Sequence, residues 1–119
     1  NVFELGGIKW MISDYWKGLA VYRSDDFEHW IRCADILDES GSRPMDKGWG
    51  HHADVVVREE RAFIFYFCHP FACEDGRQGD KLTGLTEADR NKAVIQAAEL
   101  TVRDGALRCD RNARAAWPQ

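Results

Sequence analysis

The sequence predicts an all-β fold built from two four-stranded antiparallel sheets, and three observations lead to this prediction. Short runs rich in β-branched and aromatic residues alternate with turn sequences. The pattern occurs twice, because Ile8–Ile12 aligns with Ala62–Tyr66, 54 positions further along the chain. Each copy contains four such runs, and consecutive runs joined by short turns pair as antiparallel neighbours.

The first copy lies within the first forty residues. Gly6-Gly7 separates its first two runs, a turn that ends at Gly18 separates the next two, and the polar segment Ser24–His29 precedes the last. The expected strands are Val2–Leu5, Ile8–Ser13, Leu19–Arg23 and Trp30–Leu37.

The second copy contains two tight turns, Glu59–Arg61 and Arg103–Gly105, and the Asp-Gly pair of the latter is a strong hairpin signal. Thr86–Leu100 also consists of good helix formers, which leaves a helix there as an alternative. The expected strands are Ala53–Arg58, Ala62–Cys68, Ala93–Val102 and Ala106–Cys109.

A repeat of this length is close to the size of a propeller blade, which is a four-stranded antiparallel sheet. The sequence therefore predicts one all-β unit over residues 1–119, with blade one at about 1–38 and blade two at about 53–110. A closed propeller needs about four to eight blades, so two blades leave both ends of the stack open. A self-contained sandwich of eight strands is the rival architecture.

Charge and hydropathy exclude two classes of partner. The net charge is −4 and no Lys/Arg block is present, so no nucleic-acid partner is expected. The longest apolar run, Ala62–Cys68, is far shorter than the roughly 20 residues of a membrane helix, and mean hydropathy is −0.49, so no membrane segment is expected. No targeting signal is visible, which slightly favours the cytoplasm, and the chain is compatible with a piece of a longer protein.

The four cysteines are scattered, and three of them lie in or beside expected strands, so free buried thiols are expected. A Cys68–Cys73 disulfide is the alternative. Cys68, His69 and Cys73 lack a second ligand pair at zinc-site spacing, so we expect no metal and no cofactor.

Loop lengths indicate where a functional site lies. In an up-and-down sheet, alternate connections fall on the same edge, and here the two long connections, Asp38–His52 and His69–Lys92, share an edge with Asp14–Trp16. Long ordered loops tend to carry function. His51-His52-Ala53-Asp54 opens a strand at that edge, and strand alternation puts His52 and Asp54 on one side.

Asp54 and His52 are the candidate catalytic residues, because a carboxylate beside an imidazole can orient it or separate acid and base roles near neutral pH. Turn capping by Asp54 is the alternative interpretation. Flat aromatic faces and polar side chains nearby are suited to sugar rings. The candidate substrate-binding residues are His51, Trp49, Trp16, Asp14 and Arg90.

Trp10–Asp14, Gly18–Asp26 and Trp30 together resemble the repeated blade motif of the five-bladed β-propeller glycoside hydrolases, in particular the proteins similar to glycoside hydrolase family 43. Gly50–Val57, Phe65–Pro70 and Ile95–Leu100 are similar to a late blade and the closing blade of such enzymes. The resemblance covers nearly the whole chain and suggests the C-terminal two-blade portion of such an enzyme.

The resemblance implies inverting hydrolysis of glycosidic bonds by three carboxylates, a base, a pKa modulator and an acid, on different blades. Two blades cannot hold that set, so what carries over to His51, His52 and Asp54 is a role in the substrate pocket. The resemblance also implies that calcium is possible near a histidine of the pocket.

Two functions from different classes follow. The chain is part of a glycoside hydrolase and incomplete as a catalyst alone, or it is a non-catalytic carbohydrate-binding or self-assembling β-propeller fragment. Both imply a carbohydrate partner, and both imply either a homo-oligomer or the missing blades, because exposed sheet edges favour association.

Overall fold

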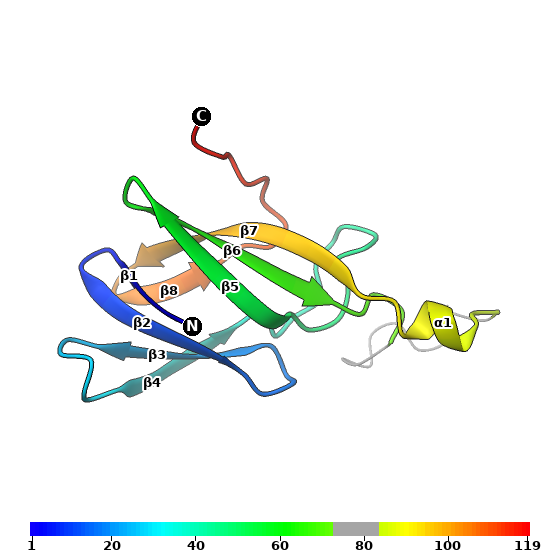
Figure 1. Ribbon diagram of the computed structural model, residues 1–119, viewed down its shortest axis with the longest axis horizontal. Helices are drawn as coiled ribbons and strands as arrows, with labels where there is room; N and C mark the ends of the chain where they lie inside the picture. The colour runs from blue at the N-terminus through cyan, green and yellow to red at the C-terminus, as the bar shows by residue number, and fades with distance from the viewer. Residues whose placement is uncertain (73–83) are drawn as a thin grey trace.

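The fold is all-β, as the sequence predicts, and consists of two four-stranded antiparallel sheets. The computed structural model describes residues 1–72 and 84–119. The sheets have the strand orders β1-β2-β3-β4 and β5-β6-β7-β8, so both are simple meanders (Figure 1). Both sheets are open.

The N-terminal sheet follows the expected strands closely. Its strands are β1 (Val2–Leu5), β2 (Ile8–Asp14), β3 (Leu19–Ser24) and β4 (Ile31–Ile36). Gly6 and Gly7 both have positive φ, at 61° and 74°, which explains why this tight hairpin turn uses glycine. The register of β3 and β4 shifts between Leu19 and Val21.

The C-terminal sheet begins two residues earlier than expected, at His51. Its strands are β5 (His51–Arg58), β6 (Arg61–Cys68), β7 (Val94–Arg103) and β8 (Ala106–Cys109). The helix-forming segment before β7 supplies only the short helix α1 (Glu87–Arg90), which a capping box at Thr86 and Asp89 starts. The expected strand over Ala93–Val102 is therefore confirmed within one residue at each end.

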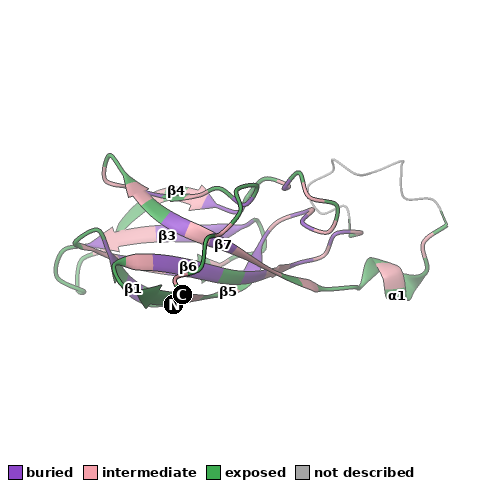
Figure 2. Ribbon diagram, turned by 90° about the horizontal axis from the view of Figure 1, so that it is seen from above, coloured by how far each residue is buried: buried purple, intermediate pink, exposed green. Residues whose placement is uncertain are grey.

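The two sheets pack face to face around one hydrophobic core (Figure 2). β1 and β2 contact β5, while β4 contacts β8. The core contains the fully buried Trp10, whose indole Nε1 donates to the Leu5 carbonyl at 3.1 Å. Its other large members include Ile12, Leu19, Val21, Ile64, Tyr66 and Leu100.

The C-terminal sheet carries large apolar side chains on both faces. Ala62, Ile64, Tyr66 and Cys68 of β6 are buried toward the core. The alternate residues Phe63, Phe65 and Phe67 pair with Glu99, Ala97 and Ile95 of β7, and they form the opposite face, which we call the outer face. Trp117 of the C-terminal segment covers part of it, at 4.4 Å from Phe63 and 5.3 Å from Phe65 between ring centroids.

Three cysteines of the described residues, Cys33, Cys68 and Cys109, are free thiols, as expected, but only Cys68 is buried and the other two are partly exposed. The alternative Cys68–Cys73 pairing lies outside the described residues. Within residues 1–72 and 84–119, no helix has the length and apolar character needed to cross a bilayer.

Candidate functional site

The site lies at one edge of the sheet pair, where β2 ends and β5 begins (Figure 1). Asp14 is the last residue of β2, Trp16 follows in the turn, and His51 and His52 open β5. Phe67 of β6 pairs with His51. We call Asp14, Trp16, His51, His52 and Phe67 the histidine cluster. Loop lengths predict most of these segments on one edge, and the structure brings them into contact.

The carboxylate of Asp14 is the polar centre of the histidine cluster. Oδ1 accepts the backbone N–H of Trp16 at 2.8 Å, and Oδ2 accepts the backbone N–H of His52 at 2.9 Å. The Nδ1 atom of His52 lies 3.0 Å from Oδ2, and that of His51 lies 3.6 Å from Oδ1. Asp14 therefore joins the two sheets and contacts both imidazoles.

A bulge at the start of β5 brings both histidines to this carboxylate. His51 pairs with Phe67 and Asp54 pairs with Phe65, so β5 has one residue more than β6 over this stretch. His52 has a φ of +32°, outside the range of a regular strand. Bulges often redirect side chains beside functional sites. Here the bulge leaves His51 fully buried and His52 exposed, with both imidazoles near Asp14.

Aromatic rings surround the two imidazoles. The Trp16 indole lies 4.5 Å from His51 and 5.6 Å from His52 between centroids. Phe67 stacks on His52 at 5.5 Å with an interplanar angle of 10°, and His69 lies 5.8 Å from His51. Trp16 is 53% exposed, so a flat aromatic surface faces solvent beside the Asp14–His52 pair.

Asp54, the other predicted catalytic residue, has partners other than His52 among the described residues. The bulge interrupts the alternation between His51 and Asp54. The Asp54 carboxylate instead accepts from the Asn1 side-chain amide at 2.5 Å and from the backbone N–H of Val55 at 2.9 Å. Asp54 lies opposite Phe65 in the ladder, two residues along β5 from His52.

Two other predicted contact residues lie outside the histidine cluster. Trp49 is half-buried, two residues before His51, and among the residues that the structure describes no ring contact joins it to an imidazole. Arg90 is exposed in α1, which extends beyond the ends of β6 and β7 (Figure 1). In the described part of the chain, no hydrogen bond or ion pair connects Arg90 to Asp14, His51 or His52.

Asp14 is ionised near neutral pH. Burial alone would raise its pKa, but the N–H groups of Trp16 and His52 and the nearby His51 outweigh burial, so the pKa lies below its ordinary 3.8. An anion held in this way suits a base, a pKa modulator or an electrostatic role, and it does not suit a general acid.

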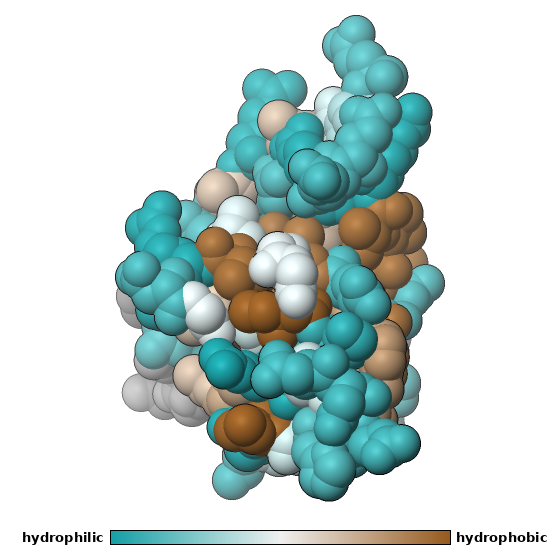
Figure 3. All heavy atoms as spheres, turned by 90° about the vertical axis from the view of Figure 1, so that its left-hand side faces the viewer, coloured by the Kyte–Doolittle hydropathy of each residue, from teal (hydrophilic) through white to brown (hydrophobic). Residues whose placement is uncertain are grey.

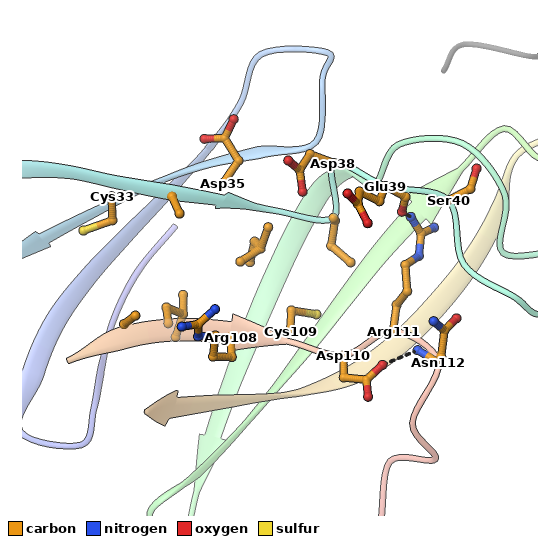
Figure 4. A pocket seen from close by; sticks show the side chains of 15 residues that line it. Cys33, Asp35, Asp38, Glu39, Ser40, Arg108, Cys109, Asp110, Arg111 and Asn112 are labelled. Atoms are coloured by element: carbon orange, nitrogen blue, oxygen red, sulfur yellow. Dashed lines mark hydrogen bonds between the residues drawn. The ribbon is translucent and has the colours of Figure 1, made fainter. Parts of the chain in front are cut away.

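Two cavities lie away from the histidine cluster. A cavity of about 470 Å³ opens between β4 and β8, and Asp38, Glu39, Arg108 and Asp110 contribute to its lining (Figure 4). A second cavity, of about 560 Å³, lies at the hairpin-turn end beside Leu5, Gly6 and Val57, where apolar and charged residues mix on the surface (Figure 3).

One group of metal-capable side chains, Asp26, Glu28 and His29, converges among the described residues. All three are exposed, and Asp26 already accepts the backbone N–H groups of Glu28 and His29 at 2.8 Å, as in a capped turn. The histidine cluster does not form such a group in this part of the chain.

A buried ion pair that no sequence motif indicates supports the loop before His51. Asp46 is fully buried and accepts from the guanidinium of Arg111, including Nε at 3.1 Å. The Tyr66 hydroxyl and Arg43 Nη2 donate to the same carboxylate, at 3.0 Å and 2.9 Å. We call Asp46, Arg111 and Tyr66 the arginine clamp. Asp46 and Arg111 lie 65 positions apart, so no local sequence signal joins them.

Comparison with models of known protein families and with curated protein sequences gives no match for this chain. The site geometry and the sequence motifs are therefore the basis for proposing a function.

Proposed function

We propose that this chain is part of a glycoside hydrolase of the five-bladed β-propeller type, with the histidine cluster in the sugar-binding pocket. In this proposal the two sheets are neighbouring blades, and the remaining blades or further copies of the chain complete the pocket. Carbohydrate is the ligand, and hydrolysis of a glycosidic bond is the reaction.

The observation that carries the proposal is the arrangement around Asp14. An ionised carboxylate is fixed by two backbone N–H groups and lies beside the exposed imidazole of His52 and the exposed indole of Trp16. Sugar rings present hydroxyl groups at their rims and apolar C–H groups on their faces. Carboxylates and imidazoles bind the former, and an indole covers the latter.

Each residue has a defined role in this proposal. Asp14 is the anion that acts as the base or as the pKa modulator, and His52 is its exposed partner toward the substrate. His51 holds Asp14 from the buried side, and Trp16 stacks on the sugar. Asp54 near the start of β5 is the second carboxylate that hydrolysis of a glycosidic bond requires in this proposal.

The large apolar side chains of the outer face, which lie beside the Arg61–Glu99 ion pair, support the propeller arrangement over a two-layer sandwich. A sandwich sheet buries one face and leaves the other polar, whereas a sheet that lies between two neighbours is apolar on both. On the outer face, Ile95 is 77% exposed, Val56 48% and Phe65 37%. A further blade packed on this face would bury these side chains.

The test measures size by light scattering and hydrolysis of a panel of aryl glycosides on the same purified sample. If the chain assembles into a working site, a defined oligomer hydrolyses at least one glycoside, and Asp14→Asn reduces kcat by at least about 100-fold, typical of an essential acid–base group. Asp54→Asn is measured in parallel to test the second carboxylate.

Asp25→Asn is the matched control, because Asp25 is exposed in the turn after β3 and lies outside the site. Its activity stays at the wild-type level. Equal hydrolysis by wild type and Asp14→Asn would contradict the catalytic role of this carboxylate.

A carbohydrate-binding module is the second candidate, and the single carboxylate of the histidine cluster favours it. Glycoside hydrolysis uses two carboxyl groups, whereas recognition needs only polar groups and an aromatic face. A folded chain that binds a sugar without hydrolysing it, and loses binding in Trp16→Ala, supports the module.

A further inference from the structure

The arginine clamp fixes the loop that leads directly into the histidine cluster: Asp46 belongs to this loop, while Arg111 and Tyr66 contact Asp46 from outside it. The loop covers residues 37–50, between the end of β4 and His51. This loop contains no helix or strand. It nevertheless determines where His51 and His52 lie relative to Asp14 of the other sheet.

Arg111 holds this loop at three points. Its guanidinium donates to the Asp46 carboxylate, to the Gly48 carbonyl at 2.8 Å and to the Glu39 carbonyl at 2.5 Å. Figure 4 shows the side chain extending from the end of β8 toward Glu39. Arg111 is 5% exposed and Asp46 is fully buried, so water does not compete for these hydrogen bonds.

The contact with Gly48 lies only three residues before His51. The same residue donates its N–H to the Ser40 hydroxyl at 2.8 Å, and Gly50 donates to the Leu37 carbonyl at 2.9 Å. Leu37 also packs so close to Gly50 that a Cβ there would lie 2.7 Å from the Leu37 Cβ. The path from Gly48 to His51 is therefore fixed on both sides.

We propose that Arg111 is a positioning residue for the Asp14–His52 pair. By fixing Gly48 and Asp46, Arg111 sets where β5 starts and therefore where its bulge lies. The bulge directs the backbone N–H and the imidazole of His52 toward Asp14. The positioning is a property of the folded chain; its importance for turnover rests on the function proposed above.

The test uses two NMR readouts on the full chain that need no substrate: the carboxyl pKa of Asp14 and the hydrogen-exchange rate of the His52 amide. In Arg111→Met the hydrogen bond from the His52 N–H to Asp14 is weakened. The Asp14 pKa then rises toward its ordinary 3.8, because a hydrogen bond that lowers it is lost. The His52 amide exchanges at least about tenfold faster, while the amides of Ile64 and Ala98 in the central strands keep their protection.

Arg61→Met is the matched control. Arg61 also forms a bidentate pair, with Glu99 at 2.8 Å, and donates to the Ala116 carbonyl, but it lies on the outer face. The Arg61→Met variant is expected to leave the Asp14 pKa and the His52 exchange rate unchanged. If Arg111→Met does not fold, Ser40→Ala gives a milder test, because it removes the acceptor of the Gly48 N–H and is expected to shift both readouts in the same direction.

Arg111→Lys separates charge from geometry. Lysine keeps the positive charge but cannot reach three acceptors in the planar arrangement of a guanidinium. Partial recovery of both readouts supports positioning by Arg111. Folded Arg111→Met or Ser40→Ala protein with the wild-type Asp14 pKa and His52 exchange rate would overturn the inference, whatever the glycoside assays show.

Discussion

At the residue scale, the carboxylate of Asp14 joins the two sheets, because it accepts the backbone N–H groups of Trp16 and His52 and lies beside both imidazoles. From strand alternation, Asp54 partners His52 as the catalytic carboxylate and Asp14 is only a substrate contact. In the structure, a bulge at His52 interrupts the regular alternation, and the His52 imidazole contacts Asp14. A bulge depends on the pairing of two strands and leaves no local signal in a run such as His51–Val57.

The lowered pKa of Asp14 predicts that the stability of the fold decreases in acid. Its folded-state pKa lies below the ordinary 3.8, so the ionised form stabilises the fold above that pH, and the contribution is lost as the pH falls through the folded value. Urea unfolding at several pH values measures it. Wild type is expected to be more stable than Asp14→Asn at pH 7, and the difference shrinks below pH 3.8.

A difference between the two proteins that stays constant from pH 7 to below pH 3 would contradict this assignment. Glu28→Gln serves as the control, since Glu28 is exposed in the turn before β4. Its stability relative to wild type should differ little across the same range.

Two thiols are predicted to be unreactive in the folded chain, those of Cys68, which is buried, and of Cys109, which is partly buried. Burial raises the pKa of Cys68 to about 11 and that of Cys109 to about 12, so both remain protonated in the folded chain at pH 8. Alkylation by iodoacetamide, followed by peptide mass mapping, is expected to modify Cys68 and Cys109 only after denaturant is added. Rapid modification of either one in the native chain would contradict its raised pKa.

At the element scale, the strands were predictable and the loop between the sheets was not. β1 and β8 begin and end at the predicted residues, and most other strand ends differ by one residue, because alternating β-branched and aromatic residues with Gly turns specify them locally. The loop at 37–50 is fixed by Arg111 from the far end of the chain. Sequence alone does not show which arginine pairs with which aspartate over such a separation.

The turn before β3 allows a matched test of backbone geometry. Gly7 and Gly18 have similar positive φ values of 74° and 84°, so alanine is strained at both. A Cβ at Gly7 meets nothing within 4 Å, whereas one at Gly18 would lie 2.7 Å from the Asp38 backbone. Gly7→Ala is expected to lower the free energy of unfolding by about 1 kcal/mol.

Gly18→Ala is expected to cost about 2 kcal/mol more than Gly7→Ala, because the clash with the start of the 37–50 loop adds to the strain. Chemical denaturation of the two variants measures the difference. Equal losses of stability would mean that the loop moves away freely, and the loop would then not be rigid at Asp38.

At the scale of the whole molecule, the apolar outer face of the C-terminal sheet predicts association. Ile95 is 77% exposed on this face, and large exposed apolar surfaces mark interaction sites. Ile95→Lys is expected to lower the apparent mass in sedimentation measurements at high concentration. Ile31→Lys is the control, because Ile31 is 62% exposed in β4 of the other sheet.

Equal effects of the two substitutions would contradict a specific role for the outer face. A reduction confined to Ile95→Lys would agree with a missing blade or a second copy on this face. Open sheet edges in the sequence pattern already predict such association, and the structure adds the apolar face that a neighbouring sheet would cover.

The measurement that tests the central claim most directly is a titration of the isotope-labelled chain with a panel of methyl glycosides, followed by NMR. We predict saturable shifts of the His52 ring and Trp16 indole resonances with at least one sugar. Asp14→Asn should weaken the affinity by about tenfold, the loss of a charge-assisted hydrogen bond of about 1.4 kcal/mol. His29, which is exposed beside Asp26, should not shift. Shifts confined to the cavity between β4 and β8, or equal affinity in Asp14→Asn, would contradict the claim.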